Sequence, residues 1–449
     1  MLRIITTADT EIMATASAVE QLPAGFPEVR CANPAGRSDH EQLIDEILDG
    51  ARVVVCRILG GRRGWPGFDV LRARCRELGV ALIALGGEAE PDAEMMAVSL
   101  APAGVVAQAG DYLRHGDAAN IEQLLRFLAD TFLLEGFGFD PPRPVDDLGV
   151  YLPGEGDVSL ERALERHDPA RPTIAVAFYR SHRLSGNTGF VDVLCEEIEA
   201  AGGNALAVWS YTLRRDGDGR VAALELIAGH ADALITTMLA TGGSGAADAV
   251  VPGGPGGDWQ QWDAEALAAL GVPVFQAVCA TRSRAAWEAS AEGLTPLDAA
   301  TQVAIPEFDG RLLAGVISFK ERCSEDSPVG TAVPRYVADR ERCARVARLA
   351  VRSARLRRTP ARERRVAIML TSFPSLHARV GMAVGLDTPA SVIKLLRALG
   401  EEGYSVDSPF EHGDELMAAL IAAGGYDPDF LTDEQLAGMP LRLPVARYL

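Results

Sequence analysis

The chain has 449 residues, 48% apolar and 23% charged, with a formal net charge of −19 at pH 7. This length allows about three domains with cores of their own, and the acidic balance argues against nucleic acid as the principal partner. The longest apolar stretch, residues 266–280, is broken by Gly271, Pro273 and Gln276, so we expect no membrane span. The N-terminus lacks the apolar core of a signal peptide, and we expect a cytoplasmic protein.

Residues 1–140 alternate short apolar runs with amphipathic ones. The pattern predicts strands over residues 2–6, 52–56 and 80–84, and helices over residues 41–48, 68–78 and 121–134. Such an alternation predicts an α/β domain with a small parallel sheet. Residues 60–64, Gly-Gly-Arg-Arg-Gly, directly follow the second strand, where a ligand could bind, although a plain turn with two exposed arginines explains them better.

Residues 141–171 are rich in proline and aspartate, and we interpret them as a linker. A second α/β domain, residues 172–335, is then predicted from further apolar runs. The expected strands cover residues 173–178, 205–208, 233–236, 272–276 and 312–319, and the expected helix covers residues 190–200.

Polar side chains gather in the loop between the strand at 173–178 and the helix at 190–200. They include Arg180, His182, Asn187 and Thr188. In open α/β sheets ligands bind beyond the carboxyl ends of strands, so this loop is a candidate binding site. In the alternative explanation Asn187 and Thr188 only cap the following helix. A core position for His182 is not expected, because two arginines flank it.

Two further stretches of this domain carry polar or glycine-rich patterns. Residues 241–259 contain seven glycines but lack the third glycine of a dinucleotide-binding fingerprint, so we interpret them as a surface loop. Glu307, Asp309, Arg311 and Lys320 form a dense set of charges beside an apolar strand. This set predicts either a site or an internal network of ion pairs.

Arginine dominates residues 336–365, which we interpret as a helix and connector. Arg345, Arg348, Arg352 and Arg355 share one helical face, which is either solvated or docks a partner chain or an anionic ligand. Residues 366–370 then predict a strand and residues 389–399 a helix, so residues 366–449 read as the start of a third, truncated α/β unit.

The stretch from Thr371 to Ser391 joins that strand to that helix. His377, Arg379, Asp387 and Thr388 supply a possible base, a cation, an acid and a hydroxyl within a dozen positions. The chain has only two lysines, Lys320 and Lys394, and neither follows a glycine-rich phosphate-binding loop. If this protein takes part in a reaction that consumes ATP, we therefore expect a partner chain to bind the ATP.

The run from His377 to Ser391, HARVGMAVGLDTPAS, resembles the large subunit of aerobic cobaltochelatase, a relative of the porphyrin-binding subunit of magnesium chelatase. Two other runs also resemble that family: YRSHRLSGNT at residues 179–188 and IPEFDGR at residues 305–311. Residues 384–389, VGLDTP, resemble the cobalt branch. Ser372-Phe373 stands where the family usually has Asn-Tyr, and Met382 where it usually has Asn.

The resemblance implies a corrin-binding subunit that covers only the N-terminal part of the family's chain. Its substrates would be metal-free hydrogenobyrinate a,c-diamide and Co²⁺. Its partners would be an AAA+ ATPase subunit, which binds the ATP, and a companion chelatase subunit. The implied catalytic residues are His377 and Asp387, and no residue is implied for the metal. The implied substrate-binding residues are Arg180, His182, Asn187, Thr188, Glu307, Asp309 and Arg379.

Two alternatives remain beside this interpretation. One is a tetrapyrrole-binding fragment or paralogue without catalysis, which the missing amides at Ser372 and Met382 favour. The other is an H-type subunit of magnesium chelatase.

Overall fold

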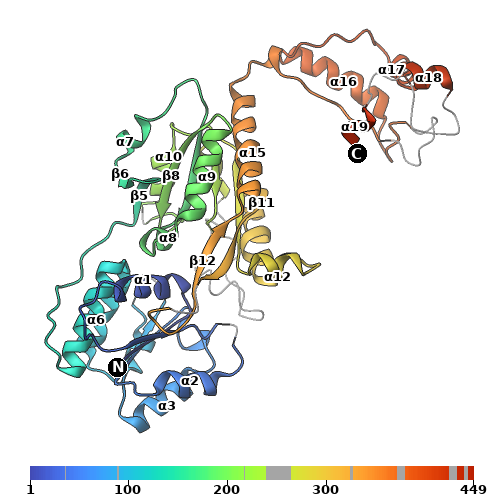
Figure 1. The fold of residues 1–449 in the computed structure, drawn as a ribbon. Helices are drawn as coiled ribbons and strands as arrows, with labels where there is room; N and C mark the ends of the chain where they lie inside the picture. The colour runs from blue at the N-terminus through green and yellow to red at the C-terminus, as the bar shows by residue number, and fades with distance from the viewer. Residues whose placement is uncertain are drawn as a thin grey trace. The chain divides into compact units, whose positions relative to one another are not determined.

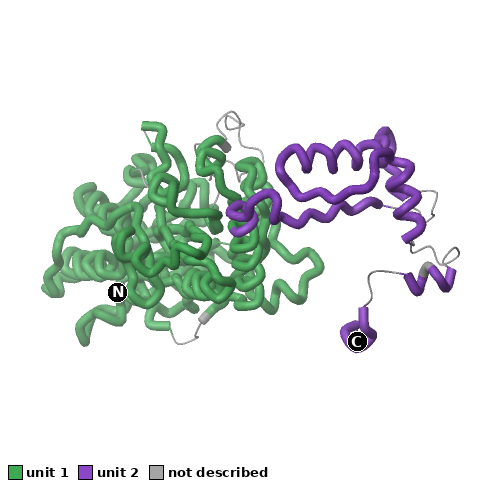
Figure 2. The backbone as a smooth tube through the Cα atoms, turned by 90° about the horizontal axis from the view of Figure 1, so that it is seen from above, with its two compact units in different colours: residues 1–354 green, residues 355–449 purple. Residues whose placement is uncertain are grey.

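The computed structural model describes residues 1–35, 37–87, 91–216, 218–238, 264–323, 327–371, 380–423, 432–438 and 443–448. The chain divides into two compact units, residues 1–354 and residues 355–449 (Figure 2). The first unit contains two β-sheets, each covered by helices, and is an α/β structure as predicted (Figure 1).

The first sheet has four parallel strands in the order β2-β1-β3-β4. Its strands are β1 (Leu2–Thr6), β2 (Val29–Ala32), β3 (Val53–Ile58) and β4 (Ala81–Gly86). Its helices are α1 (Asp9–Val19), α2 (His40–Leu48), α3 (Phe68–Leu78), α4 (Ala93–Ala97), α5 (Ala103–His115) and α6 (Ala118–Leu133). Each predicted strand and helix of this domain is confirmed, whereas β2, α1, α4 and α5 were not predicted.

Alternate residues of the strands face opposite sides of the sheet, because the side-chain period of a strand is two. Leu2 and Ile4 pack in one core with helices α1, α5 and α6, while Ile5 packs in the other with α2, α3 and α4. After β3, residues Gly61–Gly64 form a short 3-10 helix, η1, on which Arg62 and Arg63 are exposed. This conformation agrees with the expected turn and its two exposed arginines.

The second sheet has eight strands in the order β12-β11-β10-β9-β7-β8-β5-β6. They are β5 (Leu148–Leu152), β6 (Gly156–Val158), β7 (Thr173–Tyr179), β8 (Asn204–Ser210), β9 (Ala233–Thr236), β10 (Val274–Ala280), β11 (Leu312–Cys323) and β12 (Val333–Ala338). The central strands are parallel, while β12, β5 and β6 pair antiparallel at the two edges.

Helices cover both faces of this sheet. They are α7 (Leu160–Leu164), α8 (Arg180–Leu184), α9 (Gly189–Ala200), α10 (Ala222–Ile227), α11 (Ala264–Ala268), α12 (Arg284–Glu288), α13 (Pro296–Ala299), η4 (Ala300–Ala304), α14 (Ile305–Phe308) and α15 (Arg340–Arg358). Phe190 of α9 and Val346 of α15 share one core with the sheet, and Leu224 of α10 packs on the opposite face.

Two predicted domain boundaries are corrected by this sheet. The expected linker, residues 141–171, supplies β5 and β6, because the short apolar run at residues 148–152 pairs with the edge of β8. The expected connector, residues 336–365, begins inside β12 and continues as α15. The apolar stripe of α15 is buried against the second sheet, so most of this helix belongs to the second domain.

The hairpin of β11 and β12 reaches from the second sheet into the first domain. Val329 and Val333 are buried in the same core as Met13 of α1, and the Val329 carbonyl accepts a hydrogen bond of 2.9 Å from the Cys31 amide on β2. The two α/β domains therefore share a core and form one compact unit.

The second unit, residues 355–449, is helical in its described part. It contains η5 (Ala361–Glu363), α16 (Thr388–Glu401), α17 (Gly413–Ala422), α18 (Asp433–Gly438) and α19 (Val445–Tyr448). The predicted strand at residues 366–370 is wrong, since no strand occurs among the described residues of this unit and the Met369 side chain is 91% exposed. An apolar run needs a neighbouring strand or a covering helix before it can form a buried strand, so its composition alone misled the prediction.

Candidate functional site

His182 lies on the short helix α8, directly after strand β7, and is buried. The rings of Phe190 and Tyr336 stand edge-on to its imidazole, with centroid distances of 5.1 and 5.4 Å. Burial and the nearby Lys320 cation lower the pKa of His182 to about 4, so the ring is neutral at neutral pH. The expectation that His182 lies outside the core is wrong, because α8 turns the ring inward and the flanking arginines point elsewhere.

Asn187 holds this histidine in place. Its amide nitrogen lies 3.2 Å from His182 Nδ1, and its amide oxygen accepts a hydrogen bond of 3.1 Å from the Tyr336 backbone N–H. The side chain thus joins the loop after β7 to strand β12. The Thr188 hydroxyl lies 3.1 Å from the Tyr151 hydroxyl, and Thr188 makes no side-chain cap to helix α9. The capping explanation for these two residues is therefore wrong.

Arg180 is buried at the start of α8, and backbone carbonyls accept its guanidinium hydrogen bonds. They are those of Asp146 at 2.7 Å, Val145 at 3.1 Å and Arg114 at 3.2 Å. Arg114 lies at the end of α5 in the first domain, so Arg180 fastens the end of β7 to that domain. These hydrogen bonds hold the start of the loop after β7 in place.

An ion pair between the two α/β domains lies next to the His182 cluster. Lys320 Nζ on β11 donates to Asp9 Oδ2 over 2.7 Å, and Asp9 Oδ1 accepts 2.7 Å from Asn33 Nδ2. The Lys320 ammonium lies 5.6 Å from the centroid of the Tyr336 ring. Asp9 just after β1 of the first sheet, His182 and Asn187 just after β7 of the second sheet, and Lys320 on β11 therefore lie in one region around Tyr336.

The charges around residues 307–311 are split between surface and core. Asp309 and Arg311 form a fully buried ion pair of 2.7 Å, and Arg311 also donates 2.8 Å to the Gln276 side chain. Glu307 is exposed. Lys320 pairs with Asp9, so the structure does not bring the four charges of this sequence pattern into one group. The internal ion-pair explanation fits Asp309 and Arg311.

Asp387 is the N-cap of α16 in the second unit. Its Oδ1 accepts 3.0 Å from the Ala390 N–H, and its carbonyl accepts 2.6 Å from the Ser391 hydroxyl. The side chain is exposed. The other two predicted residues of this stretch, His377 and Arg379, lie outside the described residues.

A pocket of about 270 Å³ lies beside the N-terminus of α16. Its described walls come from the segment before the helix and from the first turns of the helix itself. They are Met369, Leu370, Thr371, Gly381, Ala383, Leu386, Thr388, Ser391, Val392 and Leu395. Thr388 is buried, since only 8% of its surface is exposed, and its hydroxyl has no hydrogen-bond partner among the described residues.

Some of the predicted site residues thus lie close together in the structure, and others lie apart. His182, Asn187 and Thr188 lie together, whereas Asp309 is buried elsewhere and Asp387 belongs to the other unit. Tyr336 and Asp9 were not predicted as site residues. Tyr336 lies directly opposite Lys320 in the pairing of β11 with β12. In the described part of the chain no three His, Cys, Asp or Glu side chains gather in a way that could hold a metal ion.

A model of the CobN/Magnesium Chelatase family matches residues 110–449. The chain belongs to this family. A solved member, the catalytic subunit of cobaltochelatase from Mycobacterium tuberculosis, superposes with a TM-score of 0.65 at 41% sequence identity. That match covers 94% of this chain and 33% of the other.

Curated members of the CobN/Magnesium Chelatase family give the same assignment. The aerobic cobaltochelatase subunit CobN of Pseudomonas aeruginosa is 32% identical over 95% of this chain and 33% of its own length. The H-type magnesium-chelatase subunit of Rhodobacter capsulatus is 27% identical over 75% of this chain and 28% of its own length. The chain thus spans about a third of the length of these relatives. No described helix is long and apolar enough to cross a membrane.

Proposed function

We propose that the chain is the corrin-binding part of an aerobic cobaltochelatase large subunit. Its substrates are then hydrogenobyrinate a,c-diamide and Co²⁺, which a multi-subunit metal chelatase joins at the expense of ATP during cobalamin biosynthesis. The observation that carries the proposal is the 41% identity, over 94% of the chain, to a solved cobaltochelatase catalytic subunit. Metal-free corrin, Co²⁺ and partner chains would meet in the cytoplasm.

Metal insertion requires a protein to hold the macrocycle, to accept two pyrrole protons and to admit the ion. The loop after β7 suits the first task, since ligands bind beyond the carboxyl ends of the strands in open α/β sheets. There His182 is held neutral by burial, so at neutral pH its ring can only exchange hydrogen bonds. Asn187 and Thr188 lie beside it, and Arg180 fixes the backbone of the loop.

In this proposal, groups other than His182 accept the two pyrrole protons. Asp387 is exposed, and only one of its oxygens receives the hydrogen bond of the helix cap, which supports a role for its carboxylate as proton acceptor. His377 would share this role, with Arg379 as the neighbouring cation. Glu307 is exposed and could contact the substrate, while the burial of Asp309 supports a structural part in the same segment.

ATP would be bound by partners, an AAA+ ATPase subunit and a companion chelatase subunit. The sequence supports this division of labour, because neither lysine follows a glycine-rich phosphate loop. Calorimetric titration of the chain with Mg²⁺–ATP should then give no heat of binding. A micromolar affinity would contradict the division.

A second candidate is a tetrapyrrole-binding protein of the magnesium branch, or one without catalysis. The 27% identity to an H-type magnesium-chelatase subunit supports it, although the cobaltochelatase match is both closer and longer. The two candidates differ in the ligand, because one takes a corrin and the other a porphyrin.

Absorbance titration of the chain with each metal-free ligand tests the proposal. Saturable binding of hydrogenobyrinic acid a,c-diamide, with much weaker binding of protoporphyrin IX, is expected. A preference for the porphyrin would favour the magnesium branch. His182→Asn is a suitable probe, since asparagine keeps a hydrogen-bonding group of smaller size, and exposed His230→Asn is its matched control.

A further inference from the structure

Asn187 bonds to two groups, and one of them fixes the orientation of its side-chain amide. The Tyr336 backbone N–H can only donate, so the atom that lies 3.1 Å from it is the Asn187 amide oxygen. Tyr336 lies on β12, an edge strand of the second sheet, and its N–H donates to this side chain in place of a neighbouring strand. The amide nitrogen of Asn187 is therefore the atom that faces His182 Nδ1, at 3.2 Å.

The orientation of Asn187 determines which ring nitrogen of His182 carries the proton. The amide NH₂ group only donates, so Nδ1 has to accept, and an accepting ring nitrogen carries no proton. In the neutral ring the proton then lies on Nε2. A second proton, on Nδ1, would face the Asn187 NH₂ group, so the same contact also opposes the imidazolium form.

The packing of the ring keeps this arrangement in place. Phe190 and Tyr336 stand edge-on to the imidazole, and the Tyr179 ring lies at a centroid distance of 6.4 Å. A ring turned by 180° would place a carbon instead of Nδ1 against Asn187. Because Asn187 is buried, its amide donor would then lose its partner at a position where water cannot replace it.

Nε2 is the hydrogen-bonding position of the ring that remains open. No described residue bonds to it, and His182 keeps 9% of its surface exposed. Burial and the nearby Lys320 cation lower the pKa of the ring, so it is neutral at neutral pH. A neutral N–H at this place can donate to a carbonyl or carboxylate oxygen of a ligand, but Nε2 has no lone pair with which to accept a pyrrole proton.

We infer that Asn187 is a positioning residue that holds His182 in the Nε2–H tautomer, and that His182 donates a hydrogen bond to a ligand oxygen and takes no proton in the reaction. The tautomer is a property of the chain alone. The assignment of a corrin oxygen rests on the proposed function, in which the ligand carries carboxylate and carboxamide side chains.

Nitrogen-15 NMR of the histidine-labelled chain measures the tautomer, since protonated and unprotonated ring nitrogens resonate far apart. The chain has seven histidines, and the signal of His182 is the one missing from His182→Gln. At pH 7 its Nε2 should be protonated and its Nδ1 unprotonated. His167 is an internal reference, because its Nε2 lies 3.2 Å from the Ala205 carbonyl and is fixed as a donor by a group outside this cluster.

Asn187→Asp tests whether Asn187 sets the tautomer. The carboxylate has the size of the amide but can only accept, so it should place a proton on Nδ1 of His182 and leave the His167 signals unchanged. A wild-type ring protonated on Nδ1, or an unprotonated Nδ1 in Asn187→Asp, would overturn the assignment of Asn187. The wild-type spectrum alone decides the tautomer if this variant does not fold.

Visible absorbance titration with metal-free hydrogenobyrinic acid a,c-diamide tests the donor role of His182. His182→Gln keeps an N–H donor that cannot act as a base, and it should bind within about three-fold of the wild type. His182→Phe should bind about ten-fold more weakly, since it loses one hydrogen bond. Thermal unfolding shows whether each variant is folded.

Two results of this titration would overturn the donor role and leave the proposed function intact. One is wild-type affinity in His182→Phe, and the other is an equal loss in His182→Gln and His182→Phe. A wild-type chain that binds no corrin would overturn the proposed function together with the corrin assignment, while the NMR spectrum would still decide the tautomer.

Discussion

Lys320 and Asp9 form an ion pair of 2.7 Å that joins β11 of the second sheet to the first residue of α1 in the first domain. Both side chains are about three-quarters buried, at 25% and 23% exposure. The pair lies between the Tyr336 ring and the Asn33 amide, so both charges have further polar or aromatic neighbours. It is one of the contacts that fix the two sheets relative to each other.

We predict that Lys320→Met and Asp9→Asn are coupled. A part-buried pair of this kind contributes about 0.5–1 kcal/mol beyond the sum of its separate side chains. A double-mutant cycle of urea unfolding measures this coupling. Additive single effects would show that the ion pair contributes nothing to the joint between the sheets.

The buried His182 makes the free energy of unfolding depend on pH. Its pKa is about 4 in the folded protein, against about 6.5 in the unfolded chain, so the unfolded chain binds more protons between these values. The contribution of His182 to the free energy of unfolding is therefore fully present above pH 6.5. It is lost as the pH drops towards 4, by about 3 kcal/mol in total.

Urea unfolding at pH 7, 6 and 5 measures this dependence. His182→Phe removes the titrating group, so its stability should change less over the same range, whereas the exposed His230→Asn should follow the wild type. A wild-type curve and a His182→Phe curve with the same pH dependence would contradict the low pKa.

Arg311→Met should be strongly destabilising. The substitution leaves the Asp309 carboxylate in the core without its cation, and the loss of one partner of a buried pair costs about 3–5 kcal/mol. Chemical denaturation measures the loss, and Glu307→Gln, at an exposed position of the same segment, is the control with little expected effect. If Asp309→Asn kept native stability but lost corrin binding, Asp309 would belong to the site rather than to the framework.

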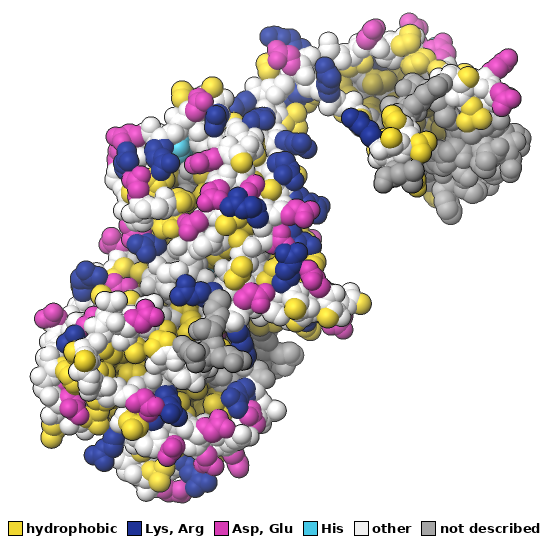
Figure 3. Space-filling view, viewed as in Figure 1, with side chains coloured by type: hydrophobic (Ala, Val, Ile, Leu, Met, Phe, Trp, Pro, Cys, Tyr) yellow, Lys and Arg dark blue, Asp and Glu magenta, His cyan; other side chains and the backbone are white. Residues whose placement is uncertain are grey.

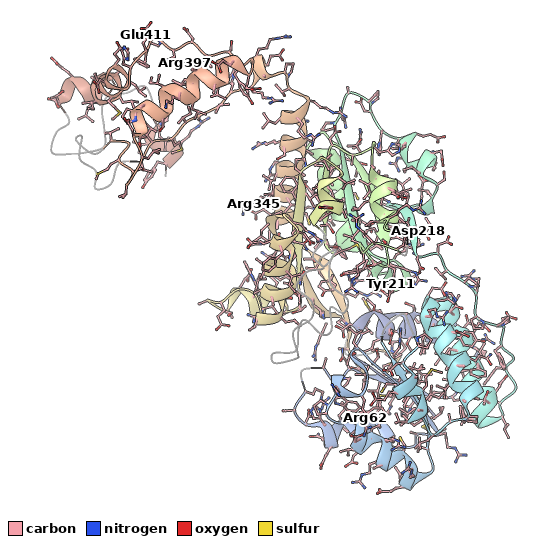
Figure 4. The ribbon with its side chains drawn as sticks, turned by 180° about the vertical axis from the view of Figure 1, so that it is seen from behind. Arg62, Tyr211, Asp218, Arg345, Arg397 and Glu411 are labelled. Carbon is pink, nitrogen blue, oxygen red and sulfur yellow. The ribbon has the colours of Figure 1, made fainter. Side chains whose placement is uncertain are left out.

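The arginine face of α15 offers a test of partner binding. Arg345, Arg348 and Arg352 are exposed and lie on one side of the helix. Figure 3 shows Lys and Arg side chains interspersed with Asp and Glu along this edge, and Figure 4 shows Arg345 extending away from the second sheet. Replacing all three by glutamine should change the free energy of unfolding by less than about 0.5 kcal/mol per site.

The same variant separates the two explanations of this face. If the face docks an ATPase partner, co-sedimentation with that partner should be lost in the triple variant and should weaken with salt in the wild type. Unchanged association would leave the arginines as a solvated surface.

Some strands and helices were predicted with nearly their observed bounds. Helix α3 spans Phe68–Leu78 as predicted, and β7 differs from its prediction by one residue. Strand β2 was missed, because four residues that include Arg30 form an edge strand only through pairing with β1. Strand β12 contains Pro334, which lowers strand propensity, and forms through pairing with β11.

The candidate site was less predictable than the fold. The loop after β7 was located correctly, yet the inward orientation of His182 depends on Phe190 and Tyr336, and Tyr336 is distant in sequence. Asp309 and Arg311 looked like site residues because charge density does not distinguish a buried pair from a binding site. Asp387 was chosen as an acid, while its side chain also serves as a helix cap.

The β11–β12 hairpin has a consequence for how the protein is made. Val329 and Val333 complete the core of a domain whose other strands and helices all precede residue 134. During synthesis the N-terminal domain leaves the ribosome long before these two valines exist, and Met13, Val29 and their neighbours meanwhile lack part of their cover. Final packing of the first domain must therefore wait for the second sheet, so its core depends on a contact between distant parts of the chain.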